Sequence, residues 1–183
     1  NQGEFYSEYG SFDVSITLPE NYVVGATGDL QTESELEFLY KSAEETKAYF
    51  EKTADQNLIK QGAKITVPQS SSIFKTIRYT QSNVHDFAWF ADKTFKVLKG
   101  QVDLANSKRR VTSWVMFTPR NEIFWKDAIE YVNDATYYYS LWNGDYPYNN
   151  VTAVDGTISA GGGMEYPNIT VIGNASSAHE LEV

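Results

Sequence analysis

A short run near the end of the chain combines three glycines with a carboxylate and a proline, in the order Gly161-Gly162-Gly163-Met164-Glu165-Tyr166-Pro167. Glycines let a ligand approach backbone amides closely, and proline is tolerated in a sheet mainly at an edge. An extended peptide that pairs with such an edge receives main-chain hydrogen bonds from it. Glu165 would then face one end of the peptide, where a free α-ammonium group could sit. The run therefore predicts a site that binds the N-terminus of a peptide.

The segment Gly162-Gly163-Met164-Glu165-Tyr166 resembles the G-x-M-E-N signature of the aminopeptidase N family, M1-like zinc metallopeptidases of the gluzincin type that include the leukotriene hydrolases. The resemblance implies that Glu165 binds the free amine of the substrate and that Gly162 and Gly163 pair with its backbone. It also implies that Met164 borders the pocket for the first side chain. Gly163 stands where alanine is common and Tyr166 where asparagine is usual, and this Gly-Gly-Met-Glu-Tyr-Pro form is similar to that of many bacterial members.

Weaker similarity to the same family extends over three other stretches of the chain. Residues 11–28 resemble a strand pair of the family's N-terminal domain, residues 83–89 resemble the last strands of that domain, and residues 151–155 resemble the strand that leads into the motif. The resemblance implies a zinc-dependent aminopeptidase that removes N-terminal residues from peptides.

The zinc ligands that such an enzyme needs are not found in this sequence. The family binds zinc through His-Glu-x-x-His on a helix, because histidines at i and i+4 share one face while the glutamate activates water. His179-Glu180 begins this pattern, but Val183 stands four positions after His179 and cannot bind a metal. His179 also follows Glu165 more closely than the first zinc histidine follows the motif glutamate in the family.

The remaining residues cannot supply the metal site either. His85 and His179 are the only histidines, and the chain has no cysteine, so no catalytic residue and no zinc ligand is expected within it. We therefore interpret the chain as an internal fragment of a zinc enzyme. The fragment is expected to bind no zinc and to be inactive alone, with the metal helix beyond Val183.

Residues 1–98 show the patterns of a β domain with one inserted helix. Alternating apolar residues over 12–18 predict a strand, and residues 22–24 run back after a turn at 19–21, so we expect a hairpin. Over 33–53 apolar residues recur at helical spacing, and Thr32 with Glu35 three positions later predicts a capping box. Further strands are expected at 76–80 and 87–91.

Residues 99–183 show an α/β pattern after a polar stretch that ends at Arg110. We place a domain boundary near residues 98–100, then a strand over 111–117, a helix from Thr118-Pro119 to Gly144, and a strand over 151–155. The expected fold class is α+β. By the family resemblance, the C-terminal part of an antiparallel, saddle-like N-terminal domain is followed by the first β/α portion of a thermolysin-like catalytic domain, with the motif on its edge strand.

Composition excludes several classes of protein. Hydrophobic residues at 42% and aromatic residues at 15% are too frequent for a disordered chain. A net charge of −9 disfavours nucleic acid as a partner, since the longest basic run is Lys108-Arg109-Arg110. No apolar run approaches the roughly 20 residues of a membrane-spanning helix. Absence of cysteine excludes disulfides and thiol catalysis. The sequence leaves the oligomeric state and the compartment open, with the cell envelope or export as our expectation for the latter.

Two alternatives to an aminopeptidase stay open. A noncatalytic module with the same peptide-gripping edge would have the same sequence features. A carbohydrate-binding β module would use aromatic side chains that stack on sugar rings, and the candidates are Tyr137, Tyr138, Tyr139, Trp142, Tyr146 and Tyr148. Three successive tyrosines on a helix point in three directions, so burial against the sheet is expected to explain most of this cluster.

Other residue pairs give no chemistry of their own. Nothing in the sequence fixes the separation of Asp155 and Glu165, so a glycosidase-like acid and base pair has no support. His85 and Asp86 are adjacent in an expected strand and point to opposite faces, which favours a structural histidine. The glycosylation sequons at Asn150, Asn168 and Asn174 are interpreted as incidental.

Overall fold

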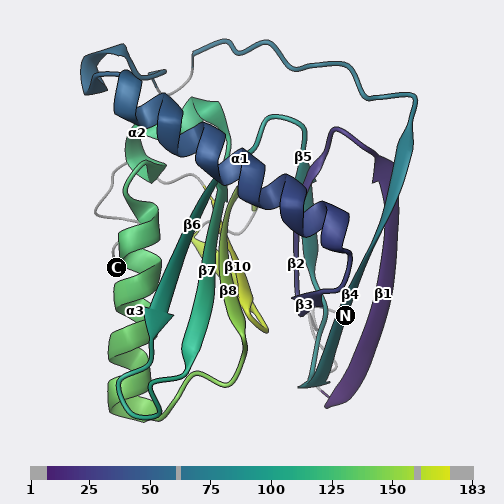
Figure 1. The fold of residues 1–183 in the computed structure, drawn as a ribbon, viewed down its shortest axis with the longest axis vertical. Coiled ribbons are helices and arrows are strands. Elements are labelled where there is room, and N and C mark those ends of the chain that lie inside the picture. The colour runs from purple at the N-terminus through teal and green to yellow at the C-terminus, as the bar shows by residue number, and fades with distance from the viewer. Residues whose placement is uncertain (1–7, 61–62, 159–161, 174–183) are drawn as a thin grey trace.

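The computed structural model describes residues 8–60, 63–158 and 162–173 of the 183-residue chain. Over these ranges the strands lie in three sheets of five, three and two strands. Figure 1 shows the five-stranded sheet and the N-terminal strands side by side, with helix α1 crossing both and helix α3 on the outer face of the larger sheet. The predicted α+β fold class is confirmed.

The first strand is paired over its whole length. β1 (Gly10–Pro19) lies antiparallel to β4 (Phe74–Val84), and β4 pairs on its other side with the short strand β3 (Asp29–Leu30). Apolar residues of β1 and β4 alternate toward a core that includes Ile16 and Ile77. The predicted period-two strand over 12–18 is therefore confirmed, and β4 contains the predicted strand over 76–80.

The predicted hairpin between residues 12–18 and 22–24 is wrong. A turn does follow β1, but β2 (Val23–Ala26) pairs antiparallel with β5 (Trp89–Asp92) in a separate sheet. All four residues of β2 are buried, and a Cβ at Gly25 would come 2.9 Å from the sulfur of Met116 in the larger sheet. Contact with that sheet fixes where β2 lies, and a local turn signal cannot reveal such a contact.

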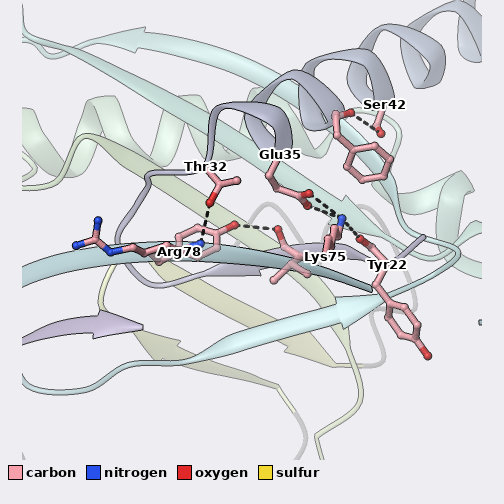
Figure 2. Close-up of polar contacts among 9 residues, drawn as sticks. Tyr22, Thr32, Glu35, Ser42, Lys75 and Arg78 are labelled. Atoms are coloured by element: carbon pink, nitrogen blue, oxygen red, sulfur yellow. Dashed lines mark hydrogen bonds and ion pairs between the residues drawn. The ribbon is translucent and has the colours of Figure 1, made fainter. Parts of the chain in front are cut away.

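Helix α1 (Glu33–Lys52) forms where the apolar spacing predicts a helix, and it buries Leu39 and Ala43. The predicted capping box is wrong. Thr32 Oγ1 accepts a hydrogen bond from the main-chain N–H of Arg78 in β4, at 2.9 Å. Glu35 turns toward Lys75, whose Nζ lies 2.8 and 2.7 Å from its two carboxylate oxygens, as Figure 2 shows. Both side chains that could cap the helix are used to attach it to the β1–β4 sheet.

The C-terminal half of α1 is attached through a second buried carboxylate, Glu122. After α1 the chain forms a 3-10 turn, η1 (Asp55–Asn57), and then runs back to β4 (Figure 1). Glu122 has no exposed surface, and its Oε2 lies 2.5 Å from Nζ of Lys96. Its Oε1 accepts hydrogen bonds from the hydroxyl of Tyr49 and the main-chain N–H of Ile59, at 2.9 and 2.6 Å. One carboxylate thus joins four segments of the chain.

The five-stranded sheet has the strand order β6-β7-β8-β10-β9. Its strands are β6 (Lys96–Asp103), β7 (Arg110–Phe117), β8 (Asn150–Gly156), β9 (Gly163–Tyr166) and β10 (Ile169–Gly173). The three central strands β7, β8 and β10 are parallel, while β6 and β9 run antiparallel to them at the two edges. The predicted strands over 111–117 and 151–155 are confirmed.

The connection from β7 to β8 contains the predicted helix in three pieces. They are η2 (Pro119–Asn121), α2 (Glu122–Trp125) and α3 (Ala128–Asn143). Pro119 opens η2, and Gly144, with φ +101°, ends α3. A helix between two parallel strands packs on one face of the sheet, and here α3 contacts β6, β7 and β8.

The expected polar stretch after residue 98 is instead part of strand β6, which the sequence analysis missed. Lys96, Lys99 and Gln101 make the strand look polar, but Val97 and Val102 are buried. Gly100 marks close packing, because a Cβ there would come 2.9 Å from Ile129 of α3. The division into residues 1–98 and 99–183 stays a prediction, and its boundary lies inside this strand.

Candidate functional site

The predicted motif forms the edge strand of the five-stranded sheet. β9 pairs antiparallel with β10 on one side, and among the described residues no strand pairs with its other side. Gly162 precedes the strand with a φ of +73°, a conformation that glycine adopts without strain. Gly161 lies outside the described residues. A sheet edge with an open hydrogen-bonding row is the kind of surface to which an extended peptide can add as a strand.

The hydrogen-bond pattern tells which backbone groups of β9 face outward. The carbonyl oxygen of Gly162 accepts a hydrogen bond from the N–H of Gly173 at 2.8 Å, so this pair is a hydrogen-bonded one. Hydrogen-bonded and non-hydrogen-bonded pairs alternate along an antiparallel ladder. The N–H and C=O groups of Gly163 and Glu165 therefore point away from β10, toward the open edge.

The side chain of Glu165 is exposed and lies over Gly163. These two residues share a face of β9, and an added Cβ at Gly163 would be 3.2 Å from Oε1 of Glu165. Glu165 is opposite Thr170 of β10. In the described part of the chain no ion pair involves Glu165. The carboxylate is thus available to a cationic ligand at the edge.

Met164 and Tyr166 lie on the opposite face of β9, toward the N-terminal strands. The ring of Tyr166 lies 6.2 Å from the ring of Phe90 in β5, measured between centroids. Met164 is half-buried. This face anchors the strand, while the face with Glu165 is exposed.

The sequence analysis missed Asn168, which it treats as an incidental sequon. Asn168 follows Pro167 in the two-residue turn between β9 and β10, has a φ of +53° and is 4% exposed. Its side-chain oxygen accepts a hydrogen bond from the N–H of Gly28, at 2.9 Å. The signal in the sequence was the Pro-Asn pair itself, because proline followed by an asparagine with positive φ is typical of a type II turn.

Asp155 does not form a pair with Glu165. It lies on β8, with β10 between it and β9, and its carboxylate is buried. Asp155 Oδ2 accepts hydrogen bonds from the main-chain N–H and the hydroxyl of Thr118, at 2.9 and 2.6 Å, and Asn121 Nδ2 donates to both carboxylate oxygens. Asp155 therefore holds the start of η2 and has a structural role.

The aromatic cluster divides into a packed and an exposed part. Tyr137 and Tyr146 pack against the core of the larger sheet, whereas Tyr138, Tyr139 and Trp142 on α3 are 47%, 59% and 68% exposed. The rings of Tyr138 and Tyr139 are tilted by 31° and 80° to that of Trp142. Rings tilted in this way do not form one flat surface for a sugar, so the geometry disfavours the carbohydrate alternative.

Metal-ligating side chains do not gather in the described ranges. There, no three histidine, cysteine, aspartate or glutamate side chains lie close enough to hold a metal ion. His85 instead contacts the ring of Tyr9, with a centroid distance of 5.7 Å, and His179 lies outside the described residues. None of the described helices has the length and apolarity to cross a membrane.

The described residues form a mixed α+β fold, with antiparallel sheets ahead of a mixed sheet in which β9 is an edge strand. The same fold occurs in M1 zinc metallopeptidases. A two-domain M1 zinc metallopeptidase, solved as a mutant bound to L-arginine, is 14% identical over 96% of this chain and 34% of its own, with a TM-score of 0.54. The M1 zinc metallopeptidase from Deinococcus radiodurans is 15% identical with the same coverage and a TM-score of 0.54.

A further structure of a two-domain M1 zinc metallopeptidase, a mutant bound to L-tryptophan, is 14% identical with a TM-score of 0.53. The chain spans about a third of the length of these structures. No family model matches the sequence, and no curated protein is similar to it. Similarity at this identity shows the fold, which is that of M1 zinc metallopeptidases.

Proposed function

We propose that this chain supplies the substrate-holding edge of a zinc-dependent aminopeptidase. Glu165 binds the α-ammonium group of a peptide, and the peptide backbone lies along Gly162–Glu165 and pairs with the outward N–H and C=O groups of Gly163 and Glu165. Met164 and Tyr166 complete this segment, with Met164 beside the first side chain. The observation that carries the proposal is the position of Glu165, exposed on a strand that pairs on one side with β10 within the described ranges.

The chemistry of the edge suits the end of a peptide better than its middle. A peptide that adds as a strand meets the outward N–H and C=O groups of Gly163 and Glu165. A carboxylate hydrogen-bonded to an ammonium group forms a charge-assisted bond, which is about twice as strong as a neutral one. A peptide bond in the same place carries no charge. Glu165 thus selects a free N-terminus. Because the N-terminus is held there, its position determines which peptide bond lies further along the edge.

The metal is assigned to other parts of an intact enzyme. Zinc would supply the activated water that attacks the peptide bond, but the described residues contain no cluster of ligands that fits it. Two structures with the same fold hold L-arginine and L-tryptophan, and every free amino acid carries the α-ammonium group that Glu165 is proposed to bind. This common group supports recognition at the N-terminus whatever the side chain.

A noncatalytic peptide-binding module is the second candidate. It would use the same exposed carboxylate and the same edge strand. The two candidates share the binding edge and differ in hydrolysis. Release of the first residue from a peptide by the intact protein in the presence of zinc supports the first candidate, and binding without release supports the second.

Substitution of Glu165 by glutamine tests the binding role. In the intact protein, Glu165→Gln is expected to lower kcat/KM for an aminoacyl substrate about 10- to 100-fold, since a charge-assisted hydrogen bond contributes roughly 1.5–3 kcal/mol. Zinc content, measured by elemental analysis, should not change. Glu44→Gln, at an exposed position of α1, is the matched control and should leave kcat/KM unaltered. Unchanged kinetics in Glu165→Gln would refute the role of this residue.

A further inference from the structure

Two asparagine side chains hydrogen-bond to the main chain of Gly28. The N–H of Gly28 donates to Oδ1 of Asn168 at 2.9 Å, and the carbonyl oxygen of Gly28 accepts from Nδ2 of Asn150 at 3.1 Å. The two asparagines also contact each other, with 3.4 Å between Asn168 Nδ2 and Asn150 Oδ1. We call these three residues the asparagine clamp. It joins the N-terminal strands to two neighbouring strands of the larger sheet.

The backbone of Gly28 has a conformation and a close contact that no other residue fits without strain. It has a φ of +97°, and an added Cβ would come 2.6 Å from the carbonyl oxygen of Thr80 in β4. Asp29, the next residue, accepts hydrogen bonds from Asn150 Nδ2 at 2.9 Å and from Asn149 Nδ2 at 2.7 Å. The clamp therefore holds Gly28, which directly precedes β3, and pairing of β3 with β4 already determines where this segment lies.

Asn168 links Gly28 to the candidate site. It lies in the turn that closes the β9–β10 hairpin, three positions after Glu165, and its carbonyl oxygen accepts a hydrogen bond from the N–H of Thr152 in β8. Its side chain is buried, so water cannot substitute for a lost partner without rearrangement. Hydrogen bonds are directional, so these contacts constrain where the turn that ends β9 lies.

We propose that Asn168 is a positioning residue that, through the asparagine clamp, sets where Glu165 and the open edge of β9 lie relative to the N-terminal strands. Asn168 does not touch the peptide in this arrangement. Its effect is on geometry, because Glu165 must lie within hydrogen-bond reach of an ammonium group whose peptide is also paired with the strand. The inference rests on the proposed function, which it deepens by one residue outside the motif.

The test compares ligands rather than stability. The chain is titrated with a tripeptide that has a free N-terminus and with its N-acetylated form, and binding is followed by NMR shifts of the β9 amides. The ratio of the two affinities measures recognition of the ammonium group by Glu165. We expect Asn168→Gly, which keeps the positive φ but removes both side-chain hydrogen bonds, to reduce this ratio about fivefold or more.

Two further variants separate positioning from folding. Asn168→Asp keeps the oxygen that accepts from Gly28 but loses the N–H group facing Asn150. Its ratio of affinities for the free and the acetylated peptide should therefore lie closer to the wild-type value than that of Asn168→Gly. Asn83→Gly is the matched control, because Asn83 is exposed and also has a positive φ, of +59°. It should leave the ratio at the wild-type value.

The outcomes separate the two proposals. If the wild-type chain binds the free and the acetylated peptide equally well, the proposed function fails and the inference fails with it. If the wild type discriminates and Glu165→Gln does not, the proposed function is supported. A wild-type ratio in Asn168→Gly would then overturn the positioning role alone, even if this variant melts at a lower temperature.

Discussion

The junctions beneath α1 and the open edge of β9 both contain glutamates, but the surroundings of these carboxylates differ. Glu35 and Glu122 are buried, and each is paired with a lysine, Lys75 or Lys96. Glu165 is exposed and forms no ion pair in the described part of the chain. The bonding capacity of the first two is used within the fold, whereas that of Glu165 is available to a ligand. A carboxylate that the fold does not need is the better candidate for function.

The pKa shifts at the two buried pairs show that burial disfavours their charged forms. Desolvation raises the pKa of Glu35 in spite of its bonds to Lys75, and desolvation lowers the pKa of Lys96 in spite of Glu122. Burial thus opposes the charged forms at both junctions. Such pairs are costly to break, because the partner that remains is a buried glutamate or a lysine only 17% or 19% exposed, and its charge is then uncompensated.

The largest effect is expected at Glu122. Glu122→Gln removes the charge that compensates Lys96 and is expected to destabilise the chain by about 3–5 kcal/mol, measured by urea unfolding at pH 7. The double variant Glu122→Gln with Lys96→Met removes both charges and should recover part of the loss. A loss below about 1 kcal/mol, the usual range of a surface ion pair, would show that Glu122 is not the buried junction described above.

The second effect concerns the clamp. Gly28→Ala is expected to cost about 2–4 kcal/mol, from the left-handed backbone and from the close contact with the Thr80 carbonyl. Gly144→Ala is the matched control, since Gly144 has a φ of +101° and no atom within 4 Å of its added Cβ. This control should show the backbone term alone, about 1–2 kcal/mol. Equal losses in the two variants would mean that the fold relaxes around Gly28.

The third prediction concerns the pH dependence of the free energy of unfolding, to which Tyr79, beside the Glu35 junction, contributes. Burial, and secondly the charge of Glu35, raise the pKa of the Tyr79 hydroxyl well above its usual value of 10. The unfolded chain then loses this proton at a lower pH than the folded one. The contribution of Tyr79 is complete below pH 10 and declines above it, by about 1.4 kcal/mol per pH unit.

The variant Tyr79→Phe checks this assignment. It loses the hydrogen bond to the carbonyl oxygen of Val24, about 1 kcal/mol at pH 7, but its free energy of unfolding should fall less steeply between pH 10 and 11. Parallel curves for Tyr79→Phe and the wild type would exclude a titrating Tyr79.

The smallest effect on stability is expected at Glu165. It tests directly whether this exposed carboxylate differs from the buried Glu35 and Glu122 in its importance for the fold. Glu165→Gln should change the free energy of unfolding by no more than about 0.5 kcal/mol, as for other exposed residues. Urea unfolding of this variant beside Glu122→Gln gives the contrast directly. A loss at Glu165 as large as that at Glu122 would show that its carboxylate serves the fold, and the comparison would break down.

Local patterns predict the elements with strong periodicity. The helix predicted over 33–53 and the strand over 12–18 follow from apolar spacing that persists for two or more turns or alternations, and the strand over 111–117 follows from its strongly apolar run. Strand β6 was missed because its lysines and Gly100 read as a polar linker, although the same residues fit an edge strand packed under α3. Propensity is a weak guide where long-range packing decides.

The candidate site was predicted in part. The residue types of the glycine-rich run indicate a carboxylate at a sheet edge, and the structure places Glu165 on an edge strand. The roles of Gly162, Gly163, Met164, Glu165 and Tyr166 in binding a substrate stay predictions. The clamp was not predictable, because Gly28 and Asn168 are 140 positions apart.

The amino-acid sequence by itself determined which residue types stand in the glycine-rich run and where the periodic elements form, because charge, glycine content and apolar spacing are properties of the residues and their neighbours. Tertiary structure alone decided which carboxylates are used by the fold and which ones, Glu165 among them, are exposed. Whether Glu35 faces a helix end or Lys75, and whether Asn168 is a surface sequon or part of a buried clamp, depends on segments far away in the chain. The desolvation and directional bonding that settle these choices exist only after those segments meet.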